Sequence, residues 1–118
     1  MGANIDNLPE PIKKKIMELQ NLQISLQNLV NTKEFLSGQL RETEMAVSEL
    51  EKAEPETIVY KSIGGILIKT QRDSLLDEKK SLKVSTEMRL KTVKQKEERS
   101  LQTLETMKKS IQSDLQPK

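Results

Sequence analysis

The sequence predicts a mainly α-helical fold, a long antiparallel two-helix coiled coil with a central β-hairpin that joins an oligomeric β-barrel. Two short runs rich in β-branched residues flank Gly64-Gly65 near the middle of the 118-residue chain. Segments with a seven-residue apolar repeat lie on both sides and match in length. We expect one domain over 1–118, with a first helix over 8–54, a hairpin over 57–70 and a second helix over 71–116.

The first helix is predicted by its start signal and by its repeat. Asn7 can cap free N–H groups, and Pro9 and Pro11 suit a first helical turn, where the missing donor is not needed. Pro55 ends the segment. Nine of the twelve repeat positions are apolar, which indicates a coiled-coil seam. These positions are Ile12, Lys15, Leu19, Leu22, Leu26, Leu29, Lys33, Leu36, Leu40, Thr43, Val47 and Leu50.

The hairpin is predicted by its turn and by its flanking residues. Two adjacent glycines supply the positive φ angles of a two-residue turn, so Ile63 should face Ile66 and Lys61 should face Ile68. Both faces of the two strands then carry apolar residues, which favours a barrel or sandwich built from several hairpins. A lone hairpin is marginal in water, so this segment is expected to require other chains.

The second helix has a weaker repeat than the first. Its apolar seam positions are Leu76, Leu90, Val93, Leu104, Met107 and Ile111. Polar residues interrupt them at Lys79, Lys83, Thr86, Glu97, Ser100 and Asp114, and Leu82, Leu101 and Leu115 lie just off the seam. Two arms of equal length joined by a hairpin fold back as an antiparallel pair, which brings both chain ends together.

The composition argues against catalysis and against metal or nucleotide binding. The chain has no Cys and no His, so the usual zinc ligands and the usual general base are missing, and Gly64-Gly65 lacks the Lys-Ser/Thr of a phosphate loop. We expect no enzyme, no cofactor and no metal. A net charge of +2 gives no strong attraction to nucleic acid or membrane, and no apolar run is long enough to span a bilayer. The expected location is the cytoplasm.

Two surfaces have two interpretations each. The run from Lys79 to Arg99 holds eight basic and three acidic residues. It is either a solvated coiled-coil face with salt-bridge partners or a nucleic-acid or partner-docking patch. We favour the first, because no aromatic residues are interleaved and no groove-reading motif is present. The apolar residues near the chain ends are either fraying seam or an exposed grip for other proteins. They are Ile5, Leu8, Ile12, Ile16, Met107, Ile111 and Leu115.

The hairpin and its two arms resemble the β-type subunit of prefoldin, an ATP-independent chaperone. The specific part of the resemblance is the Tyr60-Lys61 pair, the turn glycine Gly64 and the return strand Ile66-Leu67-Ile68. The likeness covers essentially the whole chain. It implies a hexamer of two α-type and four β-type chains, whose hairpins join into a β-barrel platform from which the coiled coils project. An α-type subunit would carry two hairpins.

The resemblance also implies a function. Such hexamers hold non-native proteins at the coiled-coil ends and deliver them to a cytosolic group II chaperonin. Hairpin residues would then serve oligomerisation, namely Val59, Tyr60, Ile63, Ile66, Leu67 and Ile68. We infer that the client-binding tips use Ile12, Ile16, Met107, Ile111 and Leu115. The competing hypothesis is a structural scaffold or tether without client binding.

Overall fold

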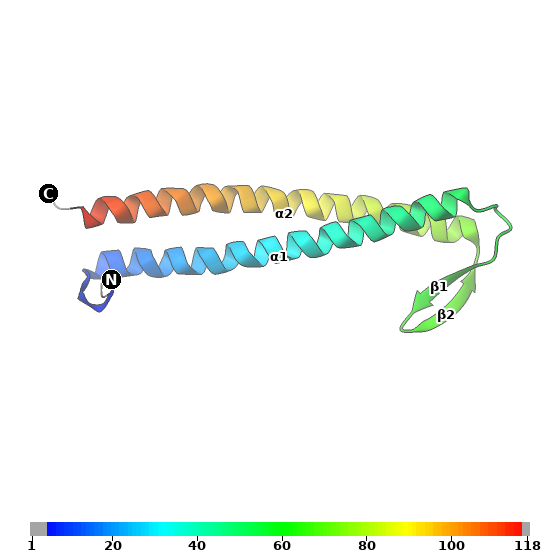
Figure 1. Ribbon diagram of the computed structural model, residues 1–118, viewed down its shortest axis with the longest axis horizontal. Coiled ribbons are helices and arrows are strands. Elements are labelled where there is room, and N and C mark those ends of the chain that lie inside the picture. Colours follow the sequence, from blue (N-terminus) through cyan, green and yellow to red (C-terminus); the bar gives the residue numbers. More distant parts are fainter. Residues whose placement is uncertain (1–4, 117–118) are drawn as a thin grey trace. The chain divides into compact units, whose positions relative to one another are not determined.

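The computed structural model describes residues 5–116 (Figure 1). The elements in chain order are η1 (Ile5–Asn7), α1 (Glu10–Lys52), β1 (Val59–Ile63), β2 (Ile66–Thr70) and α2 (Arg72–Leu115). Two long helices pack against each other and a small antiparallel hairpin lies between them in the chain, which confirms the predicted fold class.

The chain divides into two compact units. The terminal unit comprises Met1–Lys33 with Val93–Lys118, and the hairpin unit comprises Glu34–Thr92. Each unit contains a stretch of α1 paired with a stretch of α2, and the hairpin unit also carries both strands. The two units are described one at a time below.

The ends of α1 are set by two prolines. The carbonyl of Pro9 accepts the N–H groups of Ile12 and Lys13, both at 3.0 Å, so the first turn closes on a residue that precedes the helix. Pro55 follows the other end, where a proline disfavours helical dihedrals in the residue before it. A turn in which Thr57 donates to the carbonyl of Glu54 at 2.9 Å then leads into the hairpin.

The hairpin has the predicted register. Ile63 pairs with Ile66 and Lys61 with Ile68 across the antiparallel strands. Gly64 and Gly65 have φ angles of 54° and 82°, the left-handed values that a two-residue turn of this twist requires at both central positions. A side chain at either position would be strained, although no atom stands in its way.

The predicted seam of α1 faces the partner helix. All twelve repeat positions are buried or half-buried, and Leu36 is only 1% exposed. In the hairpin unit a small apolar cluster closes the end of the coiled coil, formed by Val47, Leu50, Leu75 and Leu76. Val59 of β1 packs against this cluster and thereby ties the first strand to the helices.

Polar residues that interrupt the seam in the terminal unit meet across the two helices. Lys15 donates to Ser110 Oγ at 2.9 Å and also pairs with Asp114, while Lys33 Nζ lies 2.8 Å from Glu97 Oε1. The Lys33 and Glu97 side chains are 30% and 17% exposed. Paired polar groups in an otherwise apolar seam favour one register, because any shift would leave a partly buried charge alone.

Candidate assembly surface and helix-end surface

The strands expose the apolar side chains predicted to serve assembly. Ile66 and Leu67 are 67% and 68% exposed, and Tyr60, Ile63 and Ile68 are about half exposed. These five residues are called the hairpin surface. The sixth predicted residue, Val59, is half-buried against the helices and is therefore an anchor of the hairpin within its own chain.

One face of the hairpin is fixed to the helices only at its base. Val59, Lys61 and Ile63 alternate onto this face of β1, with Ile66 next to the turn on β2. Val59 packs on the apolar cluster and Lys61 forms an ion pair with Glu78 of α2. The outer part, next to the turn, has no such support, since Ile63 and Ile66 stay exposed. The hairpin thus holds its position through its base and presents its outer half.

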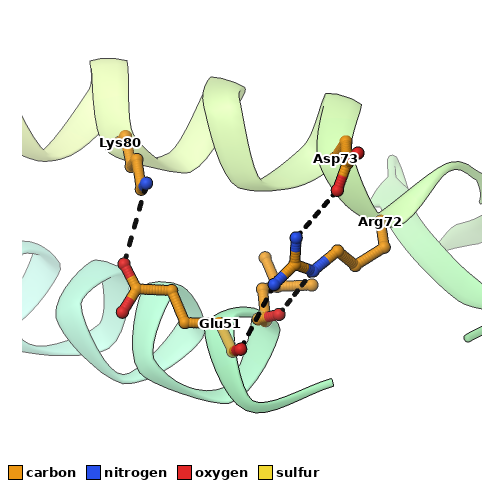
Figure 2. A network of polar contacts seen from close by, with 5 residues as sticks. Glu51, Arg72, Asp73 and Lys80 are labelled. Carbon is orange, nitrogen blue, oxygen red and sulfur yellow. Dashed lines mark hydrogen bonds and ion pairs between the residues drawn. The ribbon is translucent and has the colours of Figure 1, made fainter. Parts of the chain in front are cut away.

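Arg72 joins the base of the hairpin to the end of α1 (Figure 2). Its Nε donates to the carbonyl of Leu50 at 2.7 Å and its Nη2 to the carbonyl of Glu51 at 3.2 Å. Its Nη1 lies 2.8 Å from Asp73 Oδ1, and Lys80 forms a looser ion pair with Glu51 at 3.8 Å. The last carbonyls of a helix lack intrahelical partners and carry partial negative charge, so a guanidinium is well matched to them.

Replacing Arg72 by Lys is expected to destabilise the hairpin unit by about 1–2 kcal/mol, because one ammonium cannot replace two forked donors, one of which serves the carbonyl of the buried Leu50. The measurement is chemical denaturation followed by circular dichroism at one protomer concentration. Lys80→Ala is the matched control, since its ion pair is long and 53% exposed on both sides. Equal stability of the two variants would show that Arg72 does not secure the hairpin base.

The predicted tip residues differ in how far they are buried. Ile111 is 8% exposed and belongs to the seam, and Ile12, Ile16 and Met107 are half-buried. Leu115 alone is well exposed, at 47%. The structure therefore places four of the five along the helix–helix contact and one on the surface. Of the two further apolar residues near the start of the chain, Leu8 is half-buried, while the side chain of Ile5 lies outside the described residues.

The terminal unit also exposes apolar side chains that the sequence reasoning did not select. Met17, Ile24 and Leu101 are 61%, 62% and 50% exposed. The signal was present in the repeat, since all three stand off the seam positions, where side chains are less often covered by the partner helix. The predicted tip residues were chosen by their closeness to the chain ends and not by their distance from the seam, so the set did not include Met17 and Ile24.

The basic run is only partly engaged within its own chain. Lys79 and Lys83 are half-buried beside the seam, and Lys80 pairs with Glu51. The five basic residues from Arg89 to Arg99 are exposed and form no ion pair within the described residues, so the solvated coiled-coil face stays a prediction.

Among residues 5–116 there is no group of three His, Cys, Asp or Glu side chains placed to hold a metal ion. Within the same residues, neither helix combines the length and the apolar character that crossing a membrane requires.

Comparison with known proteins gives one consistent answer. A family model described as "Prefoldin subunit" matches residues 13–118. A prefoldin subunit beta of Archaeoglobus fulgidus is 33% identical over 110 residues, covering 93% of this chain and 95% of the relative. A prefoldin subunit beta of Thermococcus onnurineus is 28% identical over 113 residues, covering 96% and 97%.

A solved structure agrees with the sequence relatives. The crystal structure of the prefoldin beta subunit from Thermococcus strain KS-1 matches with a TM-score of 0.82 and 28% identity, over 95% of this chain and 98% of that one. The match includes the single hairpin between two long helices that the sequence predicted. On these grounds the chain belongs to the prefoldin family of chaperone subunits, as a member of the β type.

Proposed function

We propose that this chain is a subunit of an ATP-independent holdase that binds non-native proteins at its coiled-coil ends and delivers them to a group II chaperonin in the cytoplasm. Its hairpin joins those of two α-type subunits and three further β-type copies in a hexamer with a β-barrel platform. The observation that carries the proposal is the hairpin surface, five apolar side chains about half exposed or more on two strands that have no other sheet neighbour within the described residues.

Assembly is supported by the physics of the hairpin. A two-stranded sheet is marginally stable in water and leaves unpaired N–H and C=O groups along both edges. Placing the hairpin beside others in a barrel pairs those edges and covers the apolar side chains. The base of the hairpin is already tied to the helices through Val59, Lys61 and Arg72. The barrel would therefore form from elements that are positioned before assembly.

Client binding is supported by the surface of the terminal unit. Leu115 and Met17 are exposed, and Met107 lies half-buried on the seam near the end of α2. Methionine and leucine side chains adapt to varied apolar partners. Each contact is weak, but several arms on one platform raise the effective concentration, so avidity exceeds a single contact by roughly a hundredfold or more.

Deletion of 1–16 and 105–118 separates the holdase from the structural scaffold. A holdase is expected to keep its number of subunits but lose its suppression of client aggregation, measured by light scattering of a diluted, denatured client. A scaffold predicts no difference between the full and shortened forms in that assay. Loss of assembly in the shortened form would contradict the hairpin as the platform.

A double variant tests client binding by the terminal unit without changing seam residues. Met17→Ser with Leu115→Ser is expected to weaken aggregation suppression severalfold, because both side chains are exposed and their loss leaves the seam intact. Met45→Ser with Val84→Ser is the matched control in the hairpin unit, with exposures of 69% and 58%. Equal suppression by the two pairs would contradict client binding by the terminal unit.

A further inference from the structure

One stretch of α1 contains no charged residue. Residues 19–32 read LQNLQISLQNLVNT, in a chain of which 32% is charged. Just before it, five of the nine residues 10–18 are charged. The stretch of α2 in the same unit is also highly charged, with nine charged residues between positions 93 and 115. The absence of charge is therefore a local property of this part of α1.

The outward face of this part of α1 is built from amides and two apolar residues, one of which precedes the uncharged stretch. Its leucines lie half-buried on the seam. A stripe on the exposed side repeats at intervals of four and three residues, which keeps it on one side of the helix. We call this stripe the amide face, and it consists of Met17, Asn21, Ile24, Asn28 and Asn31. Exposed glutamines flank it at positions 20, 23 and 27.

Helix stability does not explain the amide face. Asparagine is a poor helix former, and an exposed helix surface gains support from charged pairs three or four residues apart, which this stretch lacks. The amides do little for one another, since the bond from Gln27 Nε2 to Asn31 Oδ1 at 3.0 Å is the one hydrogen bond between side-chain amides of this stretch in the described residues. Asn21 and Asn28 make no side-chain hydrogen bond within the part of the chain that the structure describes.

The chemistry of the amide face matches that of a polypeptide main chain. A carboxamide offers donors and an acceptor, as a peptide group does, and neither carries charge. A neutral surface accepts a segment whatever the sign of its side-chain charges, while the charged face of α2 would discriminate. Residues 19–32 extend about 21 Å at 1.5 Å per residue. That length accommodates about six residues of extended chain at about 3.3 Å each.

We propose that the amide face binds an extended segment of a non-native polypeptide, its amides bonding to the main chain and Met17 and Ile24 contacting apolar side chains. This proposal rests on the client binding proposed above and continues that surface from the helix ends along α1. Recognition of the main chain explains how one surface serves clients without a shared sequence. It also gives a reason for asparagines at exposed helix positions where stronger helix formers would fit.

The first test removes amides without weakening the helix. Asn21→Ala with Asn28→Ala is expected to reduce the affinity of the full-length protein for reduced, carbamidomethylated lysozyme by about five- to tenfold, since two hydrogen-bonding groups are lost. The thermal midpoint should stay the same or rise, because alanine is the better helix former. The matched control is Gln95→Ala with Gln102→Ala, two exposed amides at the same spacing on α2.

The second test addresses the main chain directly. A neutral peptide of about six to twelve residues, long enough to cover the face, is compared with a version N-methylated at alternate amides. N-methylation should weaken binding to the wild type severalfold but change little for Asn21→Ala with Asn28→Ala. An equal loss of affinity for both proteins would overturn recognition of the main chain. The proposal would also be overturned if Asn21→Ala with Asn28→Ala bound the lysozyme probe as tightly as the control variant, Gln95→Ala with Gln102→Ala.

The outcomes separate this proposal from the holdase itself. Wild-type protein that binds no unfolded lysozyme would overturn the proposed function and this inference with it. Normal holdase activity in Asn21→Ala with Asn28→Ala would overturn the inference alone. If these substitutions changed the particle mass but not the affinity for lysozyme, the face would be a contact between copies of the chain, and the proposal would fail.

Discussion

Replacing Ile63 by Glu and Ile66 by Lys is expected to abolish assembly while the helices stay folded. The two side chains face each other beside the turn and are 49% and 67% exposed in the single chain. Their loss therefore costs the isolated chain little, and opposite charges across the strands are tolerated within the hairpin. In a barrel each isoleucine would instead be buried.

The size of the effect follows from that difference in burial. Burying a fully exposed isoleucine is worth about 1.5–3 kcal/mol, and these two are 49% and 67% exposed before assembly, so the pair contributes about 2–3.5 kcal/mol to assembly. Removing it lowers the affinity between subunits by about 30- to 400-fold, before the cost of burying two charges is added. Native mass spectrometry with an α-type partner measures the particle, and circular dichroism checks the helices.

A matched control tests whether loss of assembly is specific to the hairpin or follows from placing charges on any exposed apolar side chains. Met45→Glu with Met88→Lys introduces the same two charges at helix positions in the same unit that are 69% and 65% exposed. This variant is expected to assemble as the wild type does. A full-sized particle from Ile63→Glu with Ile66→Lys would show that the chains assemble through another surface.

Features decided by neighbouring residues could be predicted from the sequence. The strand register follows from the position of Gly64-Gly65, because a two-residue turn leaves one way to pair the flanking strands. The α1 seam follows from a seven-residue repeat that the helix geometry converts into one face. The exposure of Leu101 and Leu115 agrees with the same repeat, since both stand off the seam, whereas Leu82 stands off the seam and is half-buried.

Features decided by the pairing of distant segments could not be predicted. Lys15 and Lys33 looked like interruptions of one repeat, and Asp114 and Glu97 like interruptions of another. Only the packed helices show that each lysine meets one of those acids. The Arg72 contact has the same origin, because its acceptors are main-chain carbonyls, which leave no mark in the sequence. A hydrophobic pattern identifies which face is inward but not which residues meet there.

Replacing Leu36 by Ala is expected to destabilise the chain by about 2–3 kcal/mol. Deleting a buried leucine side chain costs about 2–5 kcal/mol, and two helices that can move closer over the gap favour the lower half of that range. Leu36 is 1% exposed, and only seven apolar side chains in the described residues are buried. With so few buried apolar side chains, the loss of one is a large part of the free energy of unfolding, which is typically about 5–15 kcal/mol for a folded protein.

Leu101→Ala makes the same chemical change at a position that is 50% exposed. Leucine and alanine are both good helix formers, so the helix-propensity contribution is small and nearly equal at the two sites and the difference in stability reports burial. Urea denaturation of both variants at one protomer concentration is the measurement, because assembly would itself stabilise the chain by mass action. We expect Leu101→Ala to cost less than about 1 kcal/mol. If the two variants were equally stable, burial of the seam would not be what holds the two helices together, and the arms would have to be held by their ion pairs and by the assembled platform.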